Sequence, residues 1–289
     1  MNPETSRISP TGRYTAHVWI RNGLAPEVLD SRLGRALHAS LRPLDVVFER
    51  LVRRPGLDSM LLARHIALDH LLTLAVEQDG VRQIVEIAAG FSGRGLRFSR
   101  RYAGRGLLYL EGDLAGVATG KQRTLRAAGL DRPEHRIVTL NALKSGRPDG
   151  LEAVLAEQLS PDVPTAFVTE GLLPYFDRPT VLALWRRLAT TLARFPIGLY
   201  LSDLHLRNEL RGMPSFRAFQ GALGVFARGR VHVHFANEAA VARAARGAGF
   251  AAARLYHPTD LDPDLSIPAR KLGHVVRVLI ARTEQPESE

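Results

Sequence analysis

The sequence predicts an α/β domain built on a doubly wound, mostly parallel sheet of about seven strands. Short apolar runs alternate along the chain with segments of helical periodicity, which is typical of β-α-β units. Four of the runs end in a polar residue beside a turn, as parallel strands do where they lead into ligand-binding loops. A glycine-rich turn directly follows the first of them. The 289 residues suffice for one such unit with a helical extension.

The N-terminal part is expected to form a helical lid or arm, residues 1–55, with helices at about 26–41 and 46–52. The segment Ser9–Leu24 places Tyr14, His17, Trp19 and Arg21 close together. This mixture of aromatic and polar side chains suits a flap over a ligand. The structural alternative is an arm that only packs on the domain.

A further helix is predicted from Asp58 to about Glu77, because leucines recur there at helical spacing. Arg64 falls among these leucines, so its guanidinium points inward and needs an anion. That anion is either the carboxylate of a bound cofactor or a protein acid such as Asp69.

The first strand and its turn have the sequence IVEIAAGFSGRG, Ile84–Gly95. Glycines here allow a ligand to approach the backbone. Glu86 interrupts the apolar run, and it needs hydrogen-bond donors because a buried unpaired carboxylate is costly. The spacing of Ala88, Gly90 and Gly93 also fits a relaxed dinucleotide-binding motif, so NAD is one possible ligand of this turn. A turn that merely packs the strand on a helix is the structural alternative.

A helix rich in arginine follows the turn, and we expect its basic residues to form mostly a solvated face: Arg94, Arg97, Arg100, Arg101 and Arg105. The second strand lies in GLLYLEGDL and ends in two acids, Glu111 and Asp113. An acid at this position can accept hydrogen bonds from ribose hydroxyls. Asp113 is the better candidate because it directly precedes a helical segment, and Glu111 is the alternative.

The next two strands also end in polar residues. The third, 136–140, leads into Asn141 and Ala142, where the amide of Asn141 can bond an adenine edge or simply stabilise a turn. The fourth, 165–169, is followed by Glu170 and then Gly171.

The remaining elements complete the predicted domain, residues 56–282, before a tail at 283–289. A helix at 178–192 leads to a fifth strand that ends near Asp203 and His205, and a helical insertion follows at 207–228. Val231–Phe235 has the composition of a strand without a place in the sheet. After a helix at 237–247, strands at 251–256 and 273–282 should form an antiparallel hairpin at the sheet edge.

The charge and composition limit the partners that we expect. The net charge is +10, which invites a nucleic-acid partner. Only three of the 39 basic residues are lysines, however, and the other 36 are arginines spread over the whole chain. No apolar run approaches the roughly 18 residues of a membrane span, and no signal pattern opens the chain. We expect a cytoplasmic monomer or homodimer with no metal, membrane or nucleic-acid partner.

Three segments carry a resemblance to a known family: EIAAGFSGRG, YLEGD and TEGLLPYF. With them the chain resembles the leucine carboxyl methyltransferase family, in a bacterial branch similar to polyketide carboxyl methyltransferases of the tetracenomycin type. The resemblance extends from about residue 9 to 282, and TEGLLPYF looks like the family's E-G-[LV]-L-x-Y segment. It implies a class I methyltransferase fold with a helical lid, S-adenosylmethionine as methyl donor, and a carboxylate as acceptor.

The resemblance also implies a set of cofactor-binding residues: Arg64, Glu86, Ala88, Gly90, Glu111, Asp113, Asn141, Ala142 and Glu170. Arg64 would hold the cofactor's carboxylate, Glu170 its amino group and Asp113 its ribose. The chain departs from the family's patterns in three places. Ala88 replaces a glycine, Asn141 replaces an aspartate, and FSGRG replaces an L-D-T-R type sequence. The first and third departures suggest an acceptor other than a protein C-terminus.

The predicted function is the methylation of a small-molecule carboxylate, in secondary metabolism. Residues expected near the acceptor are Tyr14, Trp19, Arg21, Tyr175 and Asp203. A carboxylate is already ionised, so positioning suffices and no catalytic base is predicted. The alternative is a phenol or other hydroxyl, which needs a base, and the available histidines are His17, His205, His257 and His274. A nucleic-acid methyltransferase is a further alternative.

Overall fold

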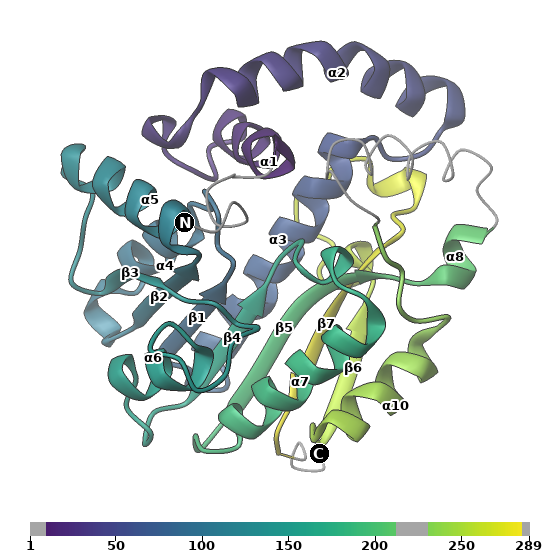
Figure 1. The fold of residues 1–289 in the computed structure, drawn as a ribbon. Helices are drawn as coiled ribbons and strands as arrows, with labels where there is room; N and C mark the ends of the chain where they lie inside the picture. Colours follow the sequence, from purple (N-terminus) through teal and green to yellow (C-terminus); the bar gives the residue numbers. More distant parts are fainter. Residues whose placement is uncertain (1–9, 212–230, 285–289) are drawn as a thin grey trace.

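A seven-stranded sheet crosses the molecule in the order β3-β2-β1-β4-β5-β7-β6 (Figure 1). The computed structural model describes residues 10–211 and 231–284. The strands are β1 (Gln83–Ile87), β2 (Leu108–Asp113), β3 (His135–Thr139), β4 (Thr165–Thr169), β5 (Gly198–His205), β6 (Ala252–Tyr256) and β7 (Val276–Arg282). The first five are parallel, and β7 runs antiparallel between β5 and β6. The predicted doubly wound sheet and its edge hairpin are therefore confirmed.

Helices cover both faces of this sheet. On one face lie α3 (Leu57–Glu77), α4 (Arg94–Arg101) and α5 (Ala115–Ala127), and on the other α6 (Leu151–Gln158), α7 (Arg178–Leu192) and α10 (Glu238–Ala248). Ile84 packs with the α3 layer and Val85 with the α7 layer, because side chains alternate across a strand. The same alternation turns Glu86 toward α3 and α4.

The N-terminal region contains α1 (Pro10–Arg21) and α2 (Arg32–Val52), which lie together at one end of the sheet (Figure 1). The predicted flap is thus mainly a helix, and its Tyr14 and Trp19 pack on Leu61 of α3. In place of the two predicted short helices there is one continuous α2, which contains Pro43. Pro43 is solvent-exposed, so water can satisfy the carbonyl that a proline leaves without a helical partner.

The connections hold short 3-10 helices: η2 (Glu27–Leu29), η3 (Ala103–Arg105), η4 (Leu173–Tyr175), η5 (Pro258–Asp260) and η6 (Arg270–Leu272). Of the predicted insertion at 207–228 the structure describes only its first helix, α8 (Arg207–Arg211). Residues 231–235 form no strand, and Phe235 makes an isolated bridge with Leu206. Of the predicted tail, 285–289 lie outside the described residues.

Helix α3 corrects one expectation from the sequence. Its 21 residues are long and apolar enough to cross a membrane, although we expected no such run. Most of the helix is buried in the domain, where Leu68 and Leu72 pack against the sheet. It covers β5 and β7 on this face of the sheet, and it carries Arg64.

Candidate active site

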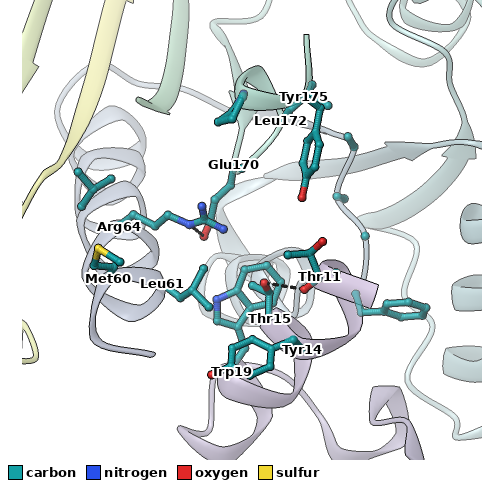
Figure 2. A pocket seen from close by; sticks show the side chains of 18 of the residues that line it. Thr11, Tyr14, Thr15, Trp19, Met60, Leu61, Arg64, Glu170, Leu172 and Tyr175 are labelled. Carbon is teal, nitrogen blue, oxygen red and sulfur yellow. Dashed lines mark hydrogen bonds and ion pairs between the residues drawn. The ribbon is translucent and has the colours of Figure 1, made fainter. Parts of the chain in front are cut away.

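A cavity of about 250 Å³ opens where β1, β4 and β5 end, beneath α1. Figure 2 shows its walls, with Arg64 of α3 reaching across to Glu170 after β4, and Tyr14 and Trp19 of α1 below. Several predicted residues line it together: Tyr14, Trp19, Arg64, Glu86, Ala88, Gly90, Glu170, Tyr175 and His205. The carboxyl ends of parallel strands are where ligands bind in open α/β sheets, so the position itself favours a binding site.

The turn after β1 shows which glycine faces a ligand. Gly90 has a φ of +54°, and a Cβ added to it would meet no atom within 4 Å. A Cβ on Gly93 would collide with Leu24 and Ala25, and one on Gly95 with Glu111 and His135. Gly93 and Gly95 therefore serve packing, whereas Gly90 leaves its backbone open to the cavity.

Arg64 is bound by two carboxylates of the protein. Its Nε donates to Glu170 Oε1 at 3.0 Å and its Nη1 to Asp203 Oδ2 at 3.2 Å. We expected Asp69 as a possible protein partner of Arg64, but the partners are Glu170 and Asp203. A guanidinium has five N–H donors, so these two bonds leave donors for a ligand in the cavity. The side chain remains 15% exposed.

Gly171 is required by this arrangement. Its φ is +67°, and a Cβ there would lie 2.9 Å from Nη2 of Arg64. The backbone N–H of Gly171 also donates to Asp203 Oδ1 at 2.6 Å. Because Gly171 has no side chain, the guanidinium of Arg64 can approach the backbone at the end of β4.

Arg94 lies at the centre of a buried ion cluster, which we call the Arg94 cluster, together with Asp69, Glu86 and Glu170. Its guanidinium donates to Asp69 at 2.5 Å, to Glu86 at 2.5 Å and to Glu170 at 2.6 Å, and its side chain is 0% exposed. Our prediction of a solvated face was wrong for Arg94, because the first turn of α4 faces the sheet where these acids converge. Burial would lower the pKa of Arg94, but the carboxylates raise it, so the charge is retained.

Glu170 stays ionised inside this cluster. Burial alone would raise its pKa, but His65, Arg94 and Arg64 together hold the pKa far below its usual range. His65 contacts Glu170 Oε2 at 2.8 Å through Nδ1, and its ring lies 4.7 Å from that of Trp19. His65 could not be identified from the sequence, because a single histidine on an apolar helix is usually structural.

The two acids of β2 differ in orientation. Glu111 is buried and paired with Lys121 and, at 2.8 Å, with His135. It faces α5 rather than the cavity, so the structure contradicts our alternative in which Glu111 holds the ribose. Asp113 instead accepts from the N–H groups of Gly90 and Leu114, both at 2.7 Å, and so fixes the loop that lines the cavity. Burial raises the pKa of Asp113.

Several other predicted residues do not line the cavity. Asn141 Oδ1 accepts from Leu143 N at 3.1 Å, which is the turn chemistry that we considered, and Ala142 packs into the core. Arg21 is exposed at the end of α1, because the buried face of that helix is occupied by apolar and aromatic residues. Asp203 is buried and pairs with Arg64, so it positions Arg64 and does not itself line the cavity. His17 pairs with Asp30 at 3.1 Å, away from the cavity.

The charges at one end of the cavity fit the cofactor that the resemblance implies. Arg64 can bind a carboxylate, and Glu170 beside it can attract an ammonium group. The open Gly90 loop leaves space for the ligand's main body. A ligand with an amino-acid end therefore suits these residues.

Solved structures share the fold of this chain. In fold, the chain is similar to a DUF574 family protein from Streptomyces avermitilis, at a TM-score of 0.65 and 12% identity, over 97% of this chain and 98% of that one. A protein from Thermobifida fusca described as a "putative methyltransferase" is also similar in fold, at a TM-score of 0.62 and 14% identity, over 96% of this chain and 98% of that one.

The sequence comparisons identify the family. A curated relative from S. avermitilis, named "Putative S-adenosyl-L-methionine-dependent methyltransferase", is 29% identical over 216 residues, 70% of this chain and 74% of the relative. The model of the leucine carboxyl methyltransferase family matches residues 26–189, which is more than half of the chain. This chain belongs to the leucine carboxyl methyltransferase family, and it is an S-adenosylmethionine-dependent methyltransferase.

Proposed function

We propose that the protein transfers the methyl group of S-adenosylmethionine to an oxygen atom of a small organic molecule held beneath α1. The observation that carries this proposal is the pairing of Arg64 and Glu170 at the edge of a cavity whose other walls are mostly apolar. The polar end suits the cofactor's methionine part. The apolar walls, with Trp19 and Tyr175, suit an aromatic or polyketide-like acceptor.

The electrostatics of the site favour a cationic cofactor over NAD. Among the described residues that line the cavity, two carboxylates, those of Glu86 and Glu170, accompany one guanidinium, that of Arg64. S-adenosylmethionine carries an ammonium and a sulfonium, whereas NAD carries an anionic pyrophosphate that this excess of carboxylates would repel.

Two acceptor oxygens are candidates. The carboxylate is the acceptor that the sequence resemblance predicts, and the name of the matching family supports it. A phenolic hydroxyl is the second candidate, because His205 lines the cavity and can serve as a base. Either product would suit secondary metabolism. We further propose a cytoplasmic monomer or homodimer that acts on small molecules, without membrane or nucleic-acid partners.

Asp113→Ala tests the cofactor site. We expect the variant to bind S-adenosylhomocysteine about 1.5–3 kcal/mol more weakly than the wild type, because Asp113 fixes the Gly90 loop and supplies a charged acceptor for the ribose. Isothermal titration calorimetry with S-adenosylhomocysteine and with NAD provides the measurement. Micromolar NAD binding by the wild type with no response to S-adenosylhomocysteine would overturn the assignment.

Arg64→Met tests whether Arg64 binds the cofactor in addition to its two protein partners. Methionine retains much of the packing of the arginine stem and removes the charge. We expect affinity for S-adenosylhomocysteine to fall by roughly 10-fold or more, as for the loss of one charged hydrogen bond.

Arg97→Met is the matched control, since Arg97 pairs with Asp69 at 2.6 Å but does not line the cavity. It should leave that affinity within about two-fold of the wild type. If Arg64→Met lowers the melting temperature but binds S-adenosylhomocysteine normally, Arg64 is only a structural ion-pair residue.

A further inference from the structure

We propose that His205 is the general base of this methyltransferase, and that the acceptor oxygen is therefore a hydroxyl, most simply that of a phenol. The inference rests on the proposed function and narrows it. It concerns the same cavity, and it selects between the two acceptor oxygens.

The hydrogen bonds of His205 fix which ring nitrogen is free. Nδ1 lies 3.0 Å from the backbone carbonyl oxygen of Val275. A carbonyl oxygen can only accept, so Nδ1 carries the proton and donates it to Val275. In the neutral ring Nε2 then has a lone pair and no proton. Among the described residues no group donates to Nε2, and the ring lines the cavity.

The surroundings of His205 keep the ring neutral. Burial lowers its pKa, and Arg64 and Arg277 act in the same direction. The Val275 carbonyl and the nearby Asp203 oppose this shift without reversing it. A neutral imidazole near pH 7 is the state that can accept a proton from an acceptor hydroxyl.

The cavity offers little for an acceptor carboxylate. Arg64 carries the one guanidinium or ammonium group among the described residues that line it, and it already bridges Glu170 and Asp203. If Arg64 binds the cofactor's carboxylate, those residues supply no second cation for an acid. The lining that His205 shares includes apolar residues such as Leu172, Pro174 and Val276, which suit a neutral aromatic ring.

The other described histidines do not combine these properties. His17 pairs with Asp30, His65 is enclosed in the ion pairs around Glu170, and neither they nor His257 and His274 line the cavity. His257 and His274 each bond a backbone carbonyl through Nε2, at 2.8 and 2.7 Å. His205 is therefore the described histidine that lines the cavity and also has a ring nitrogen without a hydrogen-bond partner among the described residues.

The transfer balances with this single base. A bond forms between the acceptor oxygen and the methyl carbon as the methyl–sulfur bond of S-adenosylmethionine breaks, and the bonding pair stays on sulfur in S-adenosylhomocysteine. The hydroxyl proton moves to Nε2 of His205, which becomes an imidazolium and later releases the proton to water. No oxidant or further reactant is needed.

The test uses the full-length enzyme with S-adenosylmethionine and three sets of probes: naphthols, the matching naphthoic acids, and 4-nitrophenol. We expect naphthols to be methylated, with kcat falling only below pH 6.5 as Nε2 takes up a proton. In His205→Gln, kcat for naphthols should fall by about 10²- to 10⁴-fold, the range for general base catalysis. For 4-nitrophenol, which is already ionised at pH 8, the loss should be less than about 10-fold, because no proton needs to be removed.

The control is His257→Gln, which removes another partly buried histidine outside the cavity and should leave kcat unchanged. If His205→Gln does not fold, His205→Ala with added imidazole replaces it, and imidazole should restore naphthol turnover. An equal loss for naphthols and 4-nitrophenol, methylation of naphthoic acids alone, or no methylation of naphthols by an enzyme that binds S-adenosylhomocysteine would each overturn the inference. Failure of the wild type to bind S-adenosylhomocysteine would instead overturn the proposed function.

Discussion

Arg94→Met is expected to lower the free energy of unfolding by about 3–5 kcal/mol, because it removes the cation shared by three carboxylates and leaves Glu86 without an ion-pair partner among the described residues. Two of the three, Glu86 and Glu170, have side chains only 2% exposed, so water cannot replace the guanidinium. Urea denaturation at pH 7 measures the loss. Arg101→Met on the same helix is the control, since Arg101 makes an exposed pair with Glu77 and should change stability by at most about 1 kcal/mol.

The loss in Arg94→Met should also depend on pH. In the folded wild type the pKa values of Asp69 and Glu170 are lowered. Their stabilising contribution is therefore fully present above the pKa of the unfolded state, near 4, and is lost as the pH falls from there toward the lowered pKa of the folded state. In the variant Glu86 loses its one ion-pair partner among the described residues, so its pKa should rise further and its burial should become less costly once it is protonated. The difference in the free energy of unfolding between the wild type and Arg94→Met should therefore become smaller as the pH falls from 7 to 4. A loss below about 1 kcal/mol at pH 7 would contradict the central role of Arg94.

Gly90→Leu is expected to abolish cofactor binding while the fold remains intact. The new side chain would meet no protein atom at its Cβ and would instead fill the cavity, where the ligand must lie. The positive φ adds a backbone cost of about 1–2 kcal/mol. We expect affinity for S-adenosylhomocysteine to fall by about 100-fold or more. Overpacking alone costs up to about 3 kcal/mol, which corresponds to roughly this factor, and the loss of contacts between ligand and protein adds to it.

Gly129→Leu separates the backbone cost from the blocked cavity. Gly129 follows α5 with a φ of +65°, and a Cβ there would also meet nothing within 4 Å, but the residue does not line the cavity. The two variants should lose similar stability. If both bind S-adenosylhomocysteine as well as the wild type does, the cofactor does not lie on the Gly90 loop.

Elements with strong local patterns could be predicted from the sequence. The apolar runs predicted the strands of the sheet, and the glycine-rich turn after β1 predicted a ligand-facing loop, in which Gly90 lines the cavity. TEGLLPYF could be identified by its likeness to a family segment, and the structure supplies the physical reason. Glu170 holds Arg64, and Gly171 must lack a side chain so that Arg64 can lie against it.

Features that depend on distant residues could not be predicted. Arg94 and Arg101 lie on the same short helix, and nothing local distinguishes the buried residue from the exposed one. Only the fold brings Glu170 to Arg94, 76 positions away in the sequence. The orientation of Glu111 likewise depends on Lys121 and His135, which the strand pattern does not reveal. Periodicity fixes which face of an element is apolar, but not which charges meet across the sheet.

The position of S-adenosylhomocysteine in a crystal structure of the complex tests the assignment of this site most directly. We expect its carboxylate at Arg64, its amino group beside Glu170, its ribose at Asp113, and its sulfur facing the space between Trp19, Tyr175 and His205. Such density would place the transferable methyl group at the acceptor cavity beneath α1. Density for the ligand outside the Gly90 loop, with Arg64 still bound only to Glu170 and Asp203, would contradict the assignment.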